Sequence, residues 1–155
     1  MEQLDSIYAD KAEILELLHR YTYAVDRDEF STMTTIFADG ARFRLIGMAA
    51  GAWDMSIPEY IDFVSPIIKS CTFVVHRVSN TVIEVHDNTA TALSYLSTLY
   101  GVKAGVAVAA FGVDSASPVD VSIGAEYQDK LMKTAQGWRI TERICKALYQ
   151  RERPV

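Results

Sequence analysis

One histidine interrupts an apolar stretch in the middle of the chain. Residues 73–80 read FVVHRVSN, so that His76 lies among Phe73, Val74, Val75 and Val78. A neutral imidazole is cheaper to bury than a carboxylate, but it still needs a hydrogen-bond partner. His76 is therefore either a core histidine with one bonded nitrogen, or a general base or acid in a poorly solvated pocket.

A carboxylate at an unexpected position is the candidate partner. Asp26 follows the apolar run YTYAV, where the stripe of a helix should continue. A carboxylate near a helix C-terminus meets an unfavourable dipole, which a positive partner would relieve. The alternative is a solvated aspartate in the polar loop DRDE. If Asp26 and His76 meet, the carboxylate fixes the imidazole tautomer, and the other ring nitrogen can move a proton without a metal or an organic cofactor.

Three further side chains have candidate roles. Tyr21 lies five residues before Asp26 and either donates its phenol to a substrate oxygen or fills the core. Arg143, in WRITERICKALY, either stabilises negative charge on a substrate or leaving group or faces solvent. Tyr127 either lines a substrate pocket or fills the sheet. Trp138 is predicted to be a core anchor.

Other kinds of site find no support. His19, on the first helix, and His86, in the turn HDN, are expected at the surface. Three scattered histidines are a weak metal signal, so no metal site is predicted. The chain contains no GxGxxG, GxxxxGK[ST], HExxH or GxSxG motif. Nucleotide-binding, zinc-protease and serine-hydrolase functions are therefore unsupported.

The first part of the chain is predicted to hold three helices. Apolar residues recur at helical spacing over 5–27 and again over 30–38, where Gly40 would take a positive φ after the last turn. A third helix opens at Ser56, which has capping-box spacing to Glu59, and Pro66 is expected to end or kink it. Between the second and third helices, ARFRLIG and GAWDM are expected to pair as strands.

The second part of the chain is predicted to be a meander of long strands. β-rich segments begin at Cys71 and are separated by turn signals at 86–88 and 134–137. Their length predicts bulges and strong curvature. Residues 104–120 are expected to be part strand and part loop. This order favours a single α+β domain over 1–155, with helices on one face of a strongly curved, mostly antiparallel sheet. Such a cone encloses an apolar pocket.

Composition sets the broad class. The chain has 155 residues, of which 50% are hydrophobic and 23% charged, as expected for one packed domain. Its net charge of -5 disfavours nucleic acid as a partner. Two distant cysteines, Cys71 and Cys145, are expected to be reduced thiols. No signal peptide or membrane-spanning run is apparent, so a cytoplasmic protein without membrane association is expected.

The chain resembles the SnoaL-like branch of the NTF2-like superfamily over essentially its whole length. The resemblance is carried by ILELLHRYTYAVDRDEFSTMTTIFADGARF, HRVSNTVIEVHDNTATALSYL and YQDKLMKTAQGWRITER. It implies a cone of one curved sheet closed by helices. The superfamily hosts dehydratases, isomerases, cyclases, dehydrochlorinases and noncatalytic proteins, so the resemblance alone does not name the function.

Within this superfamily, the pattern is similar to the cofactor-free lyases: scytalone dehydratase, hexachlorocyclohexane dehydrochlorinase and bile-acid 7α-dehydratase. The resemblance implies a dyad of Asp26 and His76. The spacing of His76 to Asn80, and of Arg143 five residues after Trp138, is similar to that of the dehydrochlorinase. Tyr21 matches the tyrosine of the bile-acid dehydratase, where the dehydrochlorinase has a lysine, so halide elimination is less expected. No match is found for the second active-site histidine of scytalone dehydratase.

The sequence thus predicts a cofactor-independent dehydratase that acts on a small hydrophobic hydroxylated compound, with cyclic and polycyclic compounds included. Asp26, His76, Tyr21 and Arg143 are the predicted catalytic residues, and Tyr127 is a predicted substrate contact. One alternative is an isomerase or polyketide-type cyclase that uses the same dyad. Another is a noncatalytic ligand-binding or assembly protein, comparable to the β subunits of ring-hydroxylating oxygenases. The resemblance also implies a homo-oligomer, either a dimer or a trimer.

Overall fold

The computed structural model describes residues 2–48 and 51–155. The first part of the described chain alternates helices with a strand pair. Its elements are α1 (Glu2–Asp26), the 3-10 helix η1 (Phe30–Thr35), β1 (Phe37–Met48), β2 (Gly51–Ser56) and α2 (Ile57–Lys69). The second part is almost entirely strand. Its elements are β3 (Cys71–His86), β4 (Thr89–Val102), β5 (Val106–Val108), the 3-10 helix η2 (Ala109–Phe111), β6 (Val113–Ser115), β7 (Val119–Thr134) and β8 (Gly137–Pro154).

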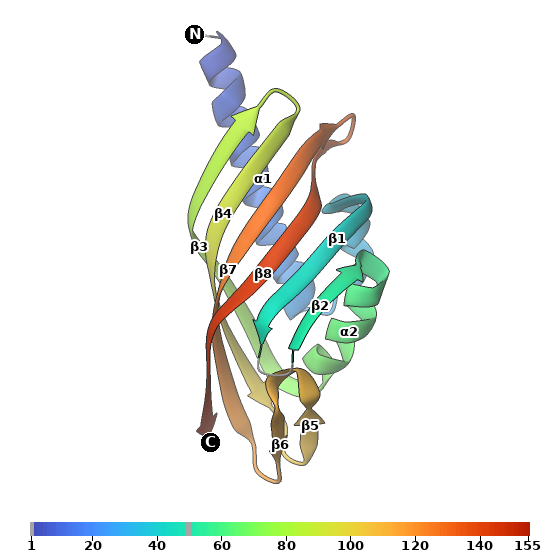
Figure 1. Cartoon of the computed structure of the whole chain (residues 1–155), viewed down its shortest axis with the longest axis vertical. Coiled ribbons are helices and arrows are strands. Elements are labelled where there is room, and N and C mark those ends of the chain that lie inside the picture. Colours follow the sequence, from blue (N-terminus) through green and yellow to red (C-terminus); the bar gives the residue numbers. More distant parts are fainter. Residues whose placement is uncertain (1, 49–50) are drawn as a thin grey trace.

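Six strands form one large curved sheet in the order β2-β1-β8-β7-β4-β3, and β5 pairs separately with β6. Only the β1–β8 pair of the large sheet is parallel. Figure 1 shows α1 running behind the sheet, α2 beside β1 and β2, and the β5–β6 hairpin beyond one end. The predicted α+β class and the mostly antiparallel, strongly curved sheet are confirmed.

The predicted set of three N-terminal helices is wrong. The described chain has one long N-terminal helix, the second predicted helix is the short η1, and α2 follows two strands. The strand already begins at Phe37, because Phe37, Ala41 and Phe43 all turn inward along β1. Gly40 does take a positive φ of 72°, but it does so inside β1. It lies where the register with β8 shifts between Phe37 and Arg42, so it serves a strand irregularity rather than a helix end.

Helix α1 is fixed to the β7–β8 hairpin by buried polar contacts. Asp10 accepts hydrogen bonds from Trp138 Nε1 at 2.9 Å and from Lys133 Nζ at 2.6 Å. Glu13 accepts a bond from the Trp138 backbone N–H at 2.9 Å. Trp138 itself is fully buried, which confirms its prediction as a core anchor. These contacts attach the N-terminal half of α1 to the β7–β8 hairpin.

Helix α2 begins as predicted. The Ser56 backbone N–H donates to Glu59 Oε2 at 2.7 Å, and the Glu59 N–H donates back to Ser56 Oγ at 3.4 Å. Pro66 does not end this helix, which continues to Lys69, so that part of the prediction is wrong. The buried face of α2 carries Tyr60, so the helix brings an aromatic hydroxyl over the sheet.

Candidate active site

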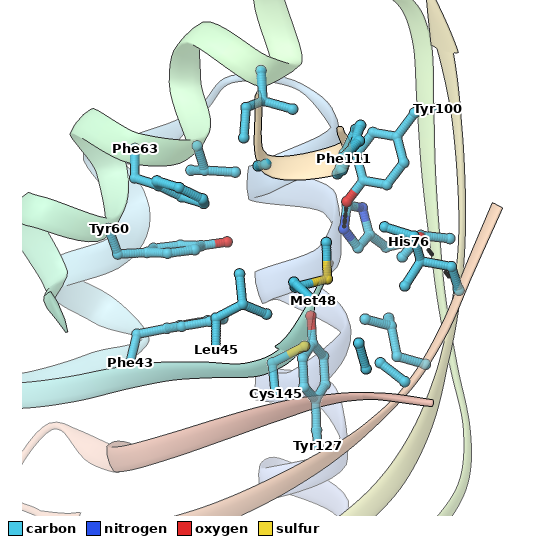
Figure 2. Close-up of a pocket in the computed structure, with 18 of the residues that line it drawn as sticks. Phe43, Leu45, Met48, Tyr60, Phe63, His76, Tyr100, Phe111, Tyr127 and Cys145 are labelled. Atoms are coloured by element: carbon cyan, nitrogen blue, oxygen red, sulfur yellow. Dashed lines mark hydrogen bonds between the residues drawn. The ribbon is translucent and has the colours of Figure 1, made fainter. Parts of the chain in front are cut away.

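A pocket opens between the inner face of the sheet and the helices. Its walls come from the last part of α1, from β1, α2, β3, β4, η2, β7 and β8, and Figure 2 shows most of the lining side chains. Most of them are aliphatic or aromatic. The lining side chains that carry polar atoms are those of His76, Tyr21, Tyr60, Tyr100, Tyr127, Thr98 and Cys145.

Asp26 and His76 are brought together. Asp26 is the last residue of α1, and its Oδ1 lies 2.5 Å from His76 Nδ1. Its Oδ2 accepts the His76 backbone N–H at 3.0 Å. This second bond is available because β3 is an edge strand, so one row of its backbone N–H groups has no neighbouring strand. The side chains of His76 and Asp26 are 5% and 16% exposed, so little water competes for these bonds.

The contacts of the imidazole define its tautomer. The Asp26 carboxylate can only accept, so Nδ1 carries the proton and the neutral ring presents an unprotonated Nε2. Nε2 lies 3.1 Å from the Tyr100 hydroxyl, which therefore donates to it. The two rings are nearly perpendicular, at 86°, and Tyr100 also packs against Phe111. In Figure 2 the Tyr100 hydroxyl meets the His76 ring at one side of the pocket.

A cluster of phenols lies deeper in the pocket. The hydroxyls of Tyr21 and Tyr60 are 2.5 Å apart, and the Tyr127 ring packs edge-on against Tyr21. Figure 2 shows the hydroxyls of Tyr60 and Tyr127 pointing inward. Burial raises the pKa of all three phenols, most strongly for Tyr60 and Tyr127. They therefore stay protonated at neutral pH and act as hydrogen-bond donors.

Arg143 lies behind this cluster. It is completely buried, and its Nε and Nη2 bond to both carboxylate oxygens of Asp129 at 2.7 and 2.8 Å. Its guanidinium carbon lies 4.2 Å from the ring centre of Tyr21 and 4.1 Å from that of Tyr127. Arg143 does not line the pocket. Its charge therefore reaches a bound molecule through the two tyrosines, and direct contact with a substrate finds no support.

A one-residue bulge explains why Arg143 points inward. Trp138 and Ile140 face the core, so strict alternation would turn Arg143 outward. Thr141 is extra in the register, because Ile140 pairs with Leu131 and Glu142 with Lys130. The bulge reverses the alternation from that point and places Arg143 opposite Asp129. Bulges were expected from strand length, but their positions were not.

Sequence reasoning missed two polar residues of the pocket. Tyr100 lies on the inner face of β4, whose residues alternate strictly between buried and exposed from Thr89 to Thr98. That alternation, TATALSYLSTLY, was readable and would have pointed Tyr100 inward and Tyr95 outward. Tyr60 begins the stripe of α2 that continues through Val64. The other expectations for histidines are confirmed, since His19 and His86 are both exposed.

Across residues 2–48 and 51–155, no group of three or more His, Cys, Asp or Glu side chains is arranged to hold a metal ion. Among the described helices, none combines the length and apolar character needed to cross a bilayer. Cys71 and Cys145 are unpaired thiols, as expected. Cys145 lines the pocket, and burial raises its pKa to about 12. It is therefore a neutral wall residue, unsuited to nucleophilic attack at neutral pH.

Comparison with known proteins supports the expected fold. A family model described as a SnoaL-like domain matches residues 7–144. The Kfla4162 protein from Kribbella flavida superposes with a TM-score of 0.78 at 21% identity, covering 94% of this chain and 95% of that one. No curated protein matches the sequence.

Two further solved structures have names that refer to enzymes. A candidate scytalone dehydratase from Novosphingobium aromaticivorans gives a TM-score of 0.76 at 14% identity, covering 98% of this chain and 93% of that one. The hexachlorocyclohexane dehydrochlorinase LinA-type3 from Novosphingobium barchaimii gives a TM-score of 0.74 at 17% identity, covering 97% of this chain and 94% of that one. At these identities the likeness shows a shared fold alone.

Proposed function

The chain belongs to the SnoaL-like domain family, and on this premise we propose that it is a cofactor-independent dehydratase for a small hydrophobic hydroxylated compound. The observation that carries the proposal is the Asp26–His76 pair, with Nδ1 and Oδ1 at 2.5 Å and Nε2 in an apolar pocket. An imidazole held in this way has one unprotonated nitrogen that can accept a proton, and a carboxylate that stabilises the resulting cation.

The proposed reaction starts at a carbon next to a carbonyl group. His76 Nε2 takes the proton, and the negative charge moves to the carbonyl oxygen. One of the hydroxyls of Tyr21 and Tyr60 donates to this oxygen, and the other supports that donor through their mutual hydrogen bond. Their raised pKa values keep both groups protonated. Arg143, stacked against the rings of Tyr21 and Tyr127, is a positioning residue. Its positive charge stabilises the negative charge on the carbonyl oxygen without touching the substrate. Loss of a hydroxide from the neighbouring carbon completes the elimination.

Two solved structures of this fold bear names that refer to elimination, one a candidate dehydratase and the other a dehydrochlorinase. They support the proposal only through their shared fold, which carries elimination enzymes by name. The resemblance places Tyr21 where the dehydrochlorinase has a lysine, so we propose loss of water rather than loss of halide. The alternative is an isomerase or cyclase. It would use the same pair for enolisation, and its product would keep the mass of the substrate. A noncatalytic ligand-binding protein is disfavoured, because it has no need for a buried, hydrogen-bonded Asp–His pair.

The test uses purified protein and a set of cyclic β-hydroxy ketones, with products followed by mass spectrometry. Wild-type protein should release one water per turnover. His76→Ala and Asp26→Asn should abolish turnover while the far-UV circular dichroism and melting curve stay native. His86→Ala is the matched control, since His86 is exposed at the end of β3, and it should keep full activity. Full activity in either pocket variant would contradict the proposal.

A further inference from the structure

The nitrogen proposed as the base is already in contact with a second proton-bearing group. The Tyr100 hydroxyl lies 3.1 Å from His76 Nε2, and among the described residues it is the pocket hydroxyl bonded to this ring. Tyr100 was not predicted from the sequence, and the reaction described above gives it no task. Tyr100 is itself buried, with 7% of its surface exposed, and its ring is held between the His76 ring and Phe111.

We propose that Tyr100 donates its phenolic proton to the departing hydroxyl group, on the same face of the substrate from which His76 removes the hydrogen. This rests on the proposed dehydratase function. It adds a proton donor, and it assigns a stereochemical course, syn elimination from a β-hydroxy ketone. Of the other pocket phenols, Tyr21 and Tyr60 are bonded to each other and are assigned to the carbonyl oxygen, and Tyr127 packs edge-on against Tyr21.

The geometry supports a role on the same face as the base. His76 pairs with Thr98 across β3 and β4, and Tyr100 lies two residues further along β4 on the same inner face. The acceptor nitrogen and the donor oxygen are therefore neighbours on one wall. A donor for anti elimination would have to lie across the substrate from His76. Tyr100 cannot reach that side without moving its ring out of its contacts with His76 and Phe111.

The proposed step balances without any other reactant. The C–H bond breaks, its proton goes to Nε2, and its electron pair forms the enolate. That pair then forms the carbon–carbon double bond as the C–O bond breaks, and the leaving oxygen takes the Tyr100 proton and departs as water. The imidazolium N–H returns its proton to the Tyr100 oxygen across the 3.1 Å contact, so both groups recover their starting states.

Burial of Tyr100 fits this sequence of events. Desolvation raises its pKa far above that of a free phenol, so the hydroxyl keeps its proton until the hydroxide leaves. A phenolate formed in this apolar site is a strong base, and the adjacent imidazolium is the nearest acid that can reprotonate it. In the free protein the same hydroxyl donates to Nε2. Rotation about its C–O bond is enough to turn the proton toward a bound hydroxyl group.

The experiment separates carbon deprotonation from water loss in Tyr100→Phe. The probe is 3-hydroxy-1-tetralone, a bicyclic β-hydroxy ketone that gives 1-naphthol after loss of water. Deprotonation is read as exchange of the C2 hydrogens in deuterium oxide, and water loss as 1-naphthol absorbance. Tyr100→Phe should lose water elimination by roughly 100-fold, in the range for a lost general acid, while it retains C2 exchange. This exchange should vanish in the double variant with His76→Ala.

Two variants give the contrast. Tyr60→Phe should reduce exchange and water loss together, because the carbonyl contact serves both steps. Tyr149→Phe alters a half-exposed tyrosine outside the pocket and should change neither. Probe carrying deuterium at C2 cis to the hydroxyl should lose the label in the product, and the trans isomer should retain it. Loss of the trans label, or equal loss of exchange and elimination in Tyr100→Phe, would overturn the role of Tyr100.

Failure of the dehydratase proposal would look different. If wild-type protein neither exchanges the C2 hydrogens nor forms 1-naphthol, the proposed function fails for this substrate class and the inference fails with it. Exchange without any wild-type water loss would favour the isomerase alternative and would also remove a role for Tyr100 as donor. A further measurement needs no substrate: the ¹⁵N resonance of His76 Nε2 should shift in Tyr100→Phe and stay in place in Tyr149→Phe. An unshifted resonance would contradict the hydrogen bond itself.

Discussion

Arg143 on β8 and Asp129 on β7 face each other as a fully buried, doubly hydrogen-bonded ion pair directly behind the tyrosines of the pocket. Desolvation opposes a charged guanidinium here, but the field of Asp129 outweighs it and raises the pKa of Arg143. The arginine is therefore permanently charged. Its guanidinium bonds to Asp129 on one side and packs against the rings of Tyr21 and Tyr127 on the other.

Removing only the cation should unfold the protein more readily. Arg143→Met leaves Asp129 buried without a partner and should lower the free energy of unfolding by about 3–5 kcal/mol, the cost expected for half of a buried pair. Urea denaturation measures this value. Arg143→Met combined with Asp129→Leu should recover much of the loss, since no charge is then stranded. A single variant as stable as wild type would show that the pair contributes nothing.

The hydrogen bonds that Asp10 of α1 accepts from the β7–β8 hairpin should stabilise the fold. Asp10→Ala leaves the Trp138 indole N–H and the Lys133 ammonium without their shared acceptor, at a cost of about 1–3 kcal/mol for the buried donor. Asp5→Ala, at an exposed position of the same helix, is the matched control. Thermal or urea unfolding compares the two. Equal stability of both variants would argue against an anchoring role for Asp10.

The same carboxylate predicts a loss of stability in acid. Burial tends to raise the pKa of Asp10, but the hydrogen bonds from Lys133 and Trp138 outweigh it and lower the pKa below its usual value of 3.8. The unfolded chain thus binds this proton first as the pH falls. The contribution of Asp10 is complete above about pH 4 and disappears as the pH falls through its folded pKa. Asp10→Asn should flatten this part of the stability curve.

Alkaline pH should destabilise the protein because the thiol of Cys145 is buried in the pocket wall. Burial raises the pKa of Cys145 from 9.0 to about 12. The unfolded thiol therefore loses its proton first, and the stability from this group, complete below pH 9, falls as the pH rises toward 12. The slope is at most about 1.4 kcal/mol per pH unit for one group. Cys145→Ala should reduce the slope of unfolding free energy against pH. An unchanged slope would show that Cys145 does not cause the alkaline loss of stability, and the buried tyrosines would then be the groups to test.

Self-association, expected from the sequence, stays a prediction. The outer face of the sheet exposes Val82 on β3 with Leu93 and Tyr95 on β4, and Val82 and Leu93 are register partners. Apolar side chains grouped on one face are typical of protein contacts. Light scattering should give a multiple of the 17.3 kDa chain mass, and Leu93→Glu should lower it, while Leu4→Glu on α1 should not. A monomer in wild type would contradict the expectation.

Residue type and position identified the two members of the central pair, but not their contact. His76 is an imidazole in an apolar strand, and Asp26 is a carboxylate where the apolar stripe of a helix should continue. Their contact explains both unusual positions. Their meeting depends on how α1 crosses the sheet, which local periodicity does not encode. The resemblance to other SnoaL-like proteins supplied that long-range information.

The errors also have local causes. The second helix was overextended because the apolar spacing of residues 30–38 fits a helix, whereas the actual elements are a 3-10 turn followed by a strand that already pairs with β8. The inward direction of Arg143 depends on a single extra residue, Thr141, which no pattern in the sequence marks. Residue type does not mark Tyr100 as a functional residue, because tyrosine is common in strands.

The central claim is that His76, held by Asp26, removes a proton from carbon. The most direct test is the rate of C2 hydrogen exchange of 3-hydroxy-1-tetralone in deuterium oxide, measured by proton NMR for wild type and Asp26→Asn. The exchange rate should fall by roughly 10²–10⁴-fold in Asp26→Asn, the range for disabling a general base, with the melting curve still native. An exchange rate equal to that of wild type would contradict the claim.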